Sequence, residues 1–180
     1  MKKLVSILAA ALIALPVAAA GDEFHLYNWN NYIAPETIKR FEGVCQCEVV
    51  QTYYSDNEEL LAKLAAGAKG YDVLVPTSNA VQALIRGSQL KPLDKTAIPN
   101  IKNVDLAYLN TPFDPGNQYS IPWQWGTTGI GFDKTKVQGD VTDWDAFKLP
   151  SIKGKSSYLD EARDAFAMAL FALGKDPNTT

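Results

Sequence analysis

Two large aromatic residues, Trp29 and Tyr32, flank a pair of amides, Asn30 and Asn31, directly after a segment that is typical of a β-strand. Open α/β sheets bind their ligands on loops of this kind, outside the carboxyl ends of the strands. A flat aromatic face there can stack on a ring or attract a cation. Aromatic residues near strand ends are more often core residues, however, and the local pattern alone favours that alternative.

Two further polar groups stand at predicted helix starts. The run Thr77 to Asn79 follows an apolar segment, 72–76, and its side-chain oxygens could either cap a helix or hold a ligand. Glu161 and Asp164 lie three residues apart, on one face of the first turn of a predicted helix over 161–173. Acids at that position also favour the helix dipole. Both groups therefore have a structural explanation beside the functional one.

The sequence contains few of the residues and motifs that catalysis or metal binding requires. Its single histidine, His25, lies inside the predicted first strand, and its two cysteines are Cys45 and Cys47. A structural zinc site needs four ligands, and the chain has no Gly-x-Ser-x-Gly nucleophile elbow. We therefore expect no catalytic residue, no metal and no cofactor. Cys45 and Cys47 are expected either to form a local disulfide or to remain a free pair at the turn before the second strand.

The first twenty residues have the pattern of a secretory signal peptide. Lys2 and Lys3 are followed by the apolar run Leu4 to Leu15, and Ala18 to Ala20 supplies the small residues of a cleavage site. The apolar run is too short for a membrane-spanning helix. We expect cleavage after Ala20 and a periplasmic location. The residue directly after the expected cleavage site is Gly21 and not a cysteine, so the sequence carries no signal for a lipid anchor.

The charge balance argues against nucleic acid as a partner. Removing Lys2 and Lys3 from the 17 basic side chains leaves 15 against 20 acidic ones, a formal net charge of −5. No basic patch interrupts this acidic chain. The balance is compatible with a cationic ligand, although mild acidity is also common in soluble proteins.

Strands and helices alternate along the first hundred residues after the signal peptide. The sequence predicts strands over 23–28, 48–54 and 72–76, a helix that begins at Pro35, and a helix over 80–86. The run Ser55 to Glu58 matches a capping box at the start of another helix. The strand at 72–76 is wholly apolar after its first residue, as expected for a buried parallel strand. This order favours a doubly wound, mostly parallel sheet.

The rest of the chain is less regular. Residues 88–122 contain scattered prolines and a turn signal at 114–117. A strand is predicted over 127–132, and a short helix is predicted to begin at Thr142. Further on, the sequence predicts a turn and a short strand over 154–158, and the helix over 161–173, with Asp160 as its cap and Gly174 just after its end. We expect a first α/β lobe over 21–126, and a crossover strand with the beginning of an incomplete second lobe over 127–180.

Five segments, in this order, carry a resemblance to one family: Leu26–Tyr32, Tyr71–Pro76, Pro112–Pro115, Tyr119–Pro122 and Trp125–Thr127. The chain resembles the periplasmic spermidine/putrescine-binding proteins of polyamine ABC transporters, from about Phe24 to Thr180. The resemblance covers only the N-terminal half of the family pattern. It implies a type II-like periplasmic binding-protein fold with two lobes, a ligand cleft between them, and no catalytic chemistry.

The resemblance also implies a set of binding residues and partners. Trp29 and Tyr32, with Asn30 beside them, match the cleft aromatics; Thr77 matches a small hydroxyl residue that contacts the ligand; and Glu161 and Asp164 match acids that face ligand ammonium groups. The implied ligand is putrescine or spermidine, and the implied partner is a membrane ABC permease. We expect a monomer.

Two positions depart from the family pattern. Asn31 stands where many polyamine binders carry Glu or Asp, and Asn79 stands where some carry Tyr. The first change removes a charge partner and the second removes a cation–π face, so both bear on which amine fits. The alternatives are a different amine, an iron complex or a sugar on the same fold, a secreted enzyme, and a truncated fragment that binds nothing.

Overall fold

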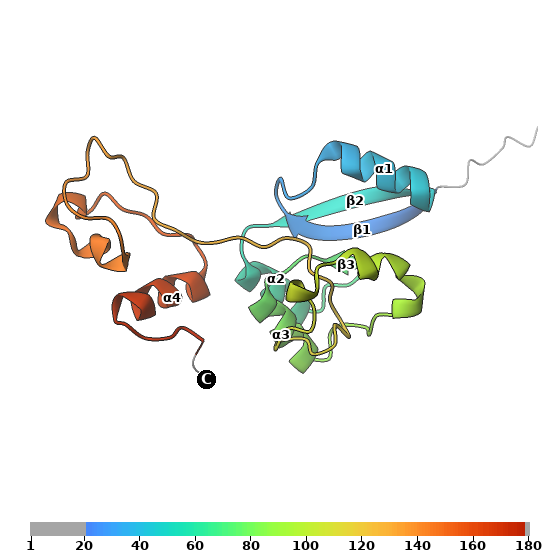
Figure 1. Cartoon of the computed structure of the whole chain (residues 1–180). Helices are drawn as coiled ribbons and strands as arrows, with labels where there is room; N and C mark the ends of the chain where they lie inside the picture. Colours follow the sequence, from blue (N-terminus) through green and yellow to red (C-terminus); the bar gives the residue numbers. More distant parts are fainter. Residues whose placement is uncertain (1–20, 179–180) are drawn as a thin grey trace, which may run out of the picture.

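The computed structural model describes residues 21–178, so the expected signal peptide lies outside the described residues. Three strands and four α-helices follow one another in this part of the chain (Figure 1). They are β1 (Asp22–Trp29), α1 (Pro35–Cys45), β2 (Cys47–Tyr54), α2 (Asn57–Ala65), β3 (Val73–Leu74), α3 (Ser78–Arg86) and α4 (Ala162–Ala172). Short 3₁₀ helices lie over Lys95–Ala97, Pro99–Asn103, Leu106–Tyr108, Trp144–Lys148 and Pro150–Ile152.

The strands form one parallel sheet in the order β2-β1-β3. β1 pairs with β2 along its whole length, from Asp22 opposite Cys47 to Trp29 opposite Tyr54. The pairing with β3 is short and joins Leu26 to Val73. Because all three strands run in the same direction, their carboxyl ends lie at one edge of the sheet. The predicted α/β fold class and parallel sheet are confirmed.

Helices cover both faces of this sheet, as Figure 1 shows, with α1 on one side and α2 and α3 on the other. Alternation along β1 directs Tyr27 toward α2 and α3, where it forms a buried cluster with Tyr54, Leu60 and Leu84. Each of these four side chains is less than a tenth exposed. The opposite face is thinner, and there Phe24 packs edge-on against Phe41 of α1. The main core therefore lies directly below the carboxyl ends of β1 and β2.

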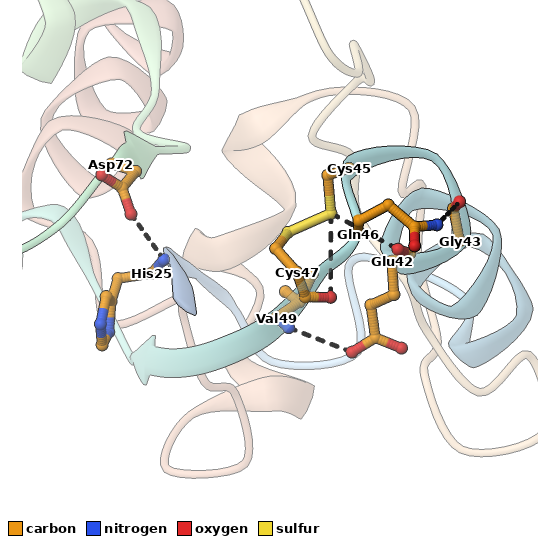
Figure 2. The surroundings of a disulfide bond; sticks show 8 residues. All are labelled: His25, Glu42, Gly43, Cys45, Gln46, Cys47, Val49 and Asp72. Carbon is orange, nitrogen blue, oxygen red and sulfur yellow. Dashed lines mark hydrogen bonds between the residues drawn. A yellow bond between two sulfur atoms is a disulfide. The ribbon is translucent and has the colours of Figure 1, made fainter. Parts of the chain in front are cut away.

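The turn between α1 and β2 is closed by a disulfide between Cys45 and Cys47, the first of the two alternatives that the sequence left open (Figure 2). The intervening residue, Gln46, ends the helix in the left-handed conformation, with φ of 56°. Glu42 adds a second tie across this turn, because its carboxylate accepts a hydrogen bond from the backbone N–H of Val49 at 3.0 Å. The start of β2 is thus joined to the end of α1 twice.

The start of α2 differs by one residue from the predicted capping box. Asp56, rather than Ser55, is the N-cap, and its carboxylate accepts a hydrogen bond from the Glu59 N–H at 2.7 Å. Glu59, rather than Glu58, reaches back and accepts from the Ser55 N–H at 2.9 Å. A capping arrangement is therefore present as predicted, but it lies one residue later in the sequence. The shift is possible because Ser, Asp and Asn, which follow one another here, are all residue types that cap helices.

The third strand is shorter than predicted. Only Val73 and Leu74 pair as β3, and Val73 is 41 % exposed, so this edge strand is not the buried strand that its apolar composition suggested. The helix after it begins at Ser78, two residues before the predicted start at Ala80. Thr77 is its N-cap residue, but no side chain caps the helix.

The predicted turn at 114–117 is present and well anchored. The Asn117 N–H donates to the Asp114 carbonyl at 2.9 Å, and the side chain of Asp114 is 2 % exposed. Its carboxylate accepts four hydrogen bonds, from the N–H groups of Gln118, Tyr119 and Ser120 and from the Ser120 hydroxyl. This carboxylate organises an irregular segment that has no sheet to hold it.

The predicted strands over 127–132 and 154–158 are absent. Residues 121–133 form an extended connection without a strand partner, which leads to the segment that contains α4 (Figure 1). A strand needs a neighbour for its backbone groups, and the described residues supply none here. The last helix, α4, begins at Ala162 with Glu161 as its N-cap, so the predicted cap at Asp160 is wrong. Gly174 follows its end with φ of 63°, as predicted.

Candidate ligand site at the carboxyl ends of the strands

Trp29, the last residue of β1, is fixed on two sides. Its indole N–H donates to the Val75 carbonyl at 2.8 Å, and its ring centroid lies 4.5 Å from that of Tyr54. The Tyr54 hydroxyl donates to the same carbonyl. Trp29 is half-buried and packs against the core cluster. It is therefore both a core residue and a wall of the strand-end surface, so the two interpretations of this aromatic are not exclusive.

Tyr32 extends this aromatic wall toward solvent. Its ring lies 6.2 Å from that of Trp29, and the side chain is 39 % exposed. The loop backbone is held from a distant part of the chain, because the Gln124 side-chain amide donates to the Tyr32 carbonyl at 3.0 Å. A partly open aromatic surface of this kind can receive a cation.

The two amides of the loop are exposed, and Asn31 has a backbone role of its own. Its φ is 56°, in the left-handed region that Asn tolerates better than most residues. The same residue lines a shallow hollow on the α1 side of the sheet, together with Tyr32, Lys39 and Tyr53. Asn30 is exposed at the tip of the turn. The structure thus offers a conformational reason for an amide at position 31, beside any effect on ligand choice.

Thr77 and Asn79 lie at the N-terminus of α3 and bond to each other. The Thr77 hydroxyl donates to the Asn79 side-chain carbonyl at 2.5 Å. The Thr77 backbone N–H donates to the side-chain carbonyl of Asn57 at 3.2 Å. Thr77 is exposed, so its hydroxyl can turn toward a ligand if it releases Asn79.

Glu161 reaches from the second part of the chain to this surface. Its Oε2 accepts hydrogen bonds from the side-chain amide of Asn57 at 2.9 Å and from the Asn57 backbone N–H at 3.4 Å. Glu161 is the N-cap residue of α4, but its side chain makes no bond to that helix. A side chain predicted to be near the ligand is therefore attached to the N-terminus of α2, 104 residues earlier in the sequence.

The structure does not bring the last predicted residue to the same place. Asp164 is half-buried on the first turn of α4, where it lines a small hollow with Arg163, Phe166 and Leu170. In residues 21–178, no hydrogen bond joins Asp164 to Trp29 or to the loop after β1. The predicted binding residues thus fall into three parts. Most of them lie at the strand ends, Glu161 is hydrogen-bonded to Asn57 at the start of α2, and Asp164 lies apart from both on α4.

Two residues of this surface were missed by the sequence reasoning. Tyr54 supplies the second ring behind Trp29, and Asn57 connects Thr77 to Glu161. The available signal was topological, because Tyr54 ends β2 and Asn57 comes soon after it, and the carboxyl end of β2 must lie beside that of β1 in a parallel sheet. Tyr54 could have been identified as the residue opposite Trp29 in register.

Burial favours the neutral form of the two inner tyrosines, Tyr27 and Tyr54, by raising the pKa of each. Burial is the main cause that raises the pKa of Tyr54 above the usual tyrosine value. Burial also raises the pKa of Tyr27, an effect that the nearby Lys63 opposes. The Lys63 ammonium lies 4.7 Å from the centre of the Tyr27 ring, which is a cation–π contact within the protein. The exposed ring of Tyr32 could make a contact of the same kind with a cationic ligand.

Residues 21–178 contain no group of three histidine, cysteine or acidic side chains placed to hold a metal ion. No helix within the same range has both the length and the apolar character needed to cross a bilayer. The arrangement that remains is a polar and aromatic surface at the carboxyl ends of parallel strands, which is a common position for ligand binding in open α/β sheets.

A parallel α/β sheet with aromatic residues at its strand ends is compatible with a solute-binding lobe, and the comparisons with known proteins identify the family. The chain belongs to the family of bacterial extracellular solute-binding proteins, whose sequence model matches residues 36–180.

Individual relatives are named for polyamines. The chain is 45% identical to the putrescine/cadaverine-binding protein of Pseudomonas aeruginosa, over 100% of this chain and 52% of the relative. It is 38% identical to the putrescine-binding periplasmic protein PotF of Escherichia coli, over 99% of this chain and 53% of the relative. The chain thus spans about half the length of these curated relatives.

Solved structures show the same fold. A putative spermidine/putrescine ABC transporter protein from Listeria monocytogenes superposes with a TM-score of 0.83 at 31% identity, over 88% of this chain and 49% of that one. The Tp0655 (TpPotD) lipoprotein of Treponema pallidum gives 0.80 at 33% identity, over 88% and 50%. The resemblance to periplasmic polyamine-binding proteins, and the type II-like fold that it implied, are therefore confirmed.

Proposed function

We propose that the protein is a periplasmic receptor that binds a polyamine, putrescine or spermidine, and delivers it to a membrane ABC permease. The single observation that carries this proposal is the strand-end surface, where the Trp29 and Tyr32 rings adjoin each other and Trp29 is bonded to Val75, two residues before Thr77. Asn57 in turn links Thr77 to Glu161. Relatives named for putrescine and spermidine support the choice of ligand class.

The chemistry of the surface suits a diamine. Such a ligand has ammonium groups joined by apolar methylenes, so carboxylates fit its ends and aromatic faces fit its middle. A hydrogen bond to a charged group contributes about 1.5–3 kcal/mol, and a cation–π contact about 0.5–2 kcal/mol. A micromolar complex needs roughly 8 kcal/mol after ordering costs. The described acids and rings reach that figure only when all of them contact the ligand.

We propose that the first lobe covers residues 21–126, and that the segment from 127 onward begins the second lobe. The extended connection over 121–133 supports this division, because it is the one stretch that leaves the first sheet for α4. Glu161 would then approach the ligand from the second lobe while Trp29 and Tyr32 approach it from the first. Asp164 joins the site only if closure on a ligand moves α4.

We also propose that the protein acts as a monomer, by binding and release rather than by catalysis, and that it has no nucleic-acid partner. The names of its relatives describe binding proteins. A secreted location agrees with the signal pattern at residues 1–20 and with relatives named as periplasmic.

A thermal-shift screen tests the ligand class. The full chain is heated alone and with putrescine, cadaverine, spermidine, a sugar or an iron complex. We expect the melting temperature to rise with at least one polyamine and to stay unchanged with the sugar and the iron complex. A rise with only the sugar or the iron complex would show that the same fold serves another solute.

A second candidate is that residues 21–180 alone bind no amine, which the coverage of about half of each relative favours. The same screen on a protein that ends at Thr180 and on any longer natural chain separates the two candidates. Micromolar binding by the shorter protein would exclude the second.

A further inference from the structure

Asn57 occupies a junction between three parts of the molecule. It is the first residue of α2, it is 1 % exposed, and it lies three residues after the end of β2. Its side-chain carbonyl accepts from the Thr77 N–H at the start of α3, and its side-chain amide donates to Glu161 at the start of α4. One buried amide therefore uses both of its ends to connect two residues of the proposed ligand surface.

The Asn57 backbone adds a second bond to the same acceptor. Its N–H donates to Glu161 Oε2 at 3.4 Å, so this carboxylate satisfies one of the N–H groups left free at the start of α2. The helix dipole also favours a negative charge at this position. Both bonds end on Oε2, and Oε1 takes part in no hydrogen bond within residues 21–178.

We propose that Asn57 is a positioning residue for amine binding, which holds the Glu161 carboxylate against the N-terminus of α2 so that its second oxygen faces the ligand. This inference rests on the function proposed above and deepens it. Without the amide donor at position 57, Glu161 would keep its charge but lose the side-chain bond that holds its carboxylate at the N-terminus of α2.

The substitution Asn57→Asp separates this role from a merely structural one. Aspartate has nearly the same shape, still accepts from the Thr77 N–H, and is favoured by the dipole at a helix start. A residue needed only for packing and for Thr77 would tolerate the change. A residue that positions Glu161 would not, because two carboxylates would then face each other.

The experiment uses the full chain and two readouts. Amide hydrogen exchange without ligand is followed at Ala165, whose N–H donates to the Glu161 carbonyl at 3.1 Å, with α1 as the internal reference. Calorimetric titration with putrescine and spermidine measures affinity. Asn103→Asp, an exposed change of the same charge, is the matched control.

We expect Asn57→Asp to speed exchange at Ala165 without changing exchange in α1, and to weaken amine binding at least tenfold. The control should match the wild type in both readouts. The double variant Asn57→Asp with Glu161→Gln exchanges donor and acceptor, so it should restore slow exchange at Ala165 while binding stays weak, because the carboxylate is missing.

Unchanged exchange at Ala165 in Asn57→Asp would overturn the inference, as would faster exchange with unchanged affinity. Exchange that stays fast in the double variant would contradict a direct bond between the two side chains. A wild-type chain that binds no polyamine would contradict the proposed function instead, while the exchange measurement would still decide whether Asn57 holds Glu161.

Discussion

The indole ring of Trp29 lies 4.5 Å from the phenol ring of Tyr54, between centroids, at an interplanar angle of 58°. Both side chains also donate a hydrogen bond to one carbonyl, that of Val75. The ends of β1 and β2 and the segment after β3 are thereby tied together at the edge of the sheet. The aromatic wall of the proposed site is thus an extension of the hydrophobic core, which gives it a fixed orientation.

Trp29→Phe removes the bond to Val75 and keeps an aromatic ring. We expect a loss of about 0.5–1.5 kcal/mol in the free energy of unfolding, the usual contribution of one hydrogen bond, and a modest loss of amine affinity. Trp29→Ala removes the ring as well, so we expect a loss of about 3–5 kcal/mol if the site behaves as a core position. Urea denaturation and calorimetric titration measure the two effects. Equal amine affinity in Trp29→Ala and the wild type would exclude Trp29 from the site.

Stability should fall at alkaline pH because of the buried tyrosines. The pKa of Tyr54 is raised in the folded state by burial, so above the usual tyrosine pKa of about 10 the unfolded chain binds fewer protons than the folded one. Stability then decreases by about 1.4 kcal/mol for each pH unit and each such group. We expect Tyr54→Phe to make this decrease shallower, as measured by urea denaturation between pH 8 and 11. An unchanged slope would show that Tyr54 ionises as easily in the folded state.

The Asp114 carboxylate should matter at neutral pH and lose its effect in acid. Burial disfavours its charge, but the bonds from Ser120, Tyr119 and Gln118 outweigh burial and lower its pKa. Its stabilisation is therefore complete above about pH 3.9, the usual aspartate pKa, and disappears as the pH falls through the lower folded value.

In the wild type, two N–H groups and one hydroxyl donate to Oδ2 of Asp114. Asp114→Asn replaces one carboxylate oxygen by an NH₂ group, which is itself a donor and cannot accept these bonds. We expect a loss of about 2–3 kcal/mol at pH 7, and a weaker acid dependence than in the wild type. Asp105→Asn is the control: this exposed aspartate accepts one bond, from the Ala107 N–H, and its replacement should cost less than about 1 kcal/mol. Denaturation curves between pH 2 and 7 decide, and equal losses in both variants would contradict the role of Asp114.

Asn31→Asp tests which residue sets the choice of amine. Aspartate tolerates the left-handed backbone found at position 31 and adds a carboxylate beside Trp29 and Tyr32. We expect spermidine affinity to rise several-fold relative to putrescine, because spermidine carries one more ammonium group. Asn103→Asp, an exposed change of the same charge outside the proposed site, is the control. The same gain in both variants would indicate a general charge effect and not a contact at position 31.

Local sequence patterns predicted the elements whose signals lie in a short stretch of sequence. β1, β2 and α1 were found because strand alternation and a proline at a helix start depend on nearby residues only. The predicted strand over 127–132 failed because a strand also needs a partner, which a pattern of β-branched and glycine residues cannot supply.

The candidate site could be located from the sequence only in part. Trp29, Tyr32 and Thr77 stand out by their place at strand ends, but local patterns favoured core packing or helix capping there, and their predicted binding roles came from the family resemblance. The bond between Asn57 and Glu161 joins residues 104 positions apart, and no local pattern encodes it. Asn31 shows the opposite limit, because an amide in a left-handed turn looks the same in sequence whether or not it meets a ligand.

Calorimetric titration of the full chain with putrescine and spermidine tests the proposed function most directly. The account predicts saturable one-to-one binding of at least one of them, with a dissociation constant in the micromolar range or below, that weakens strongly in Trp29→Ala and Glu161→Ala. Glu58→Ala, an exposed acid on the same end of α2, should bind as the wild type does. The absence of saturable binding by any polyamine up to millimolar concentration would contradict the account.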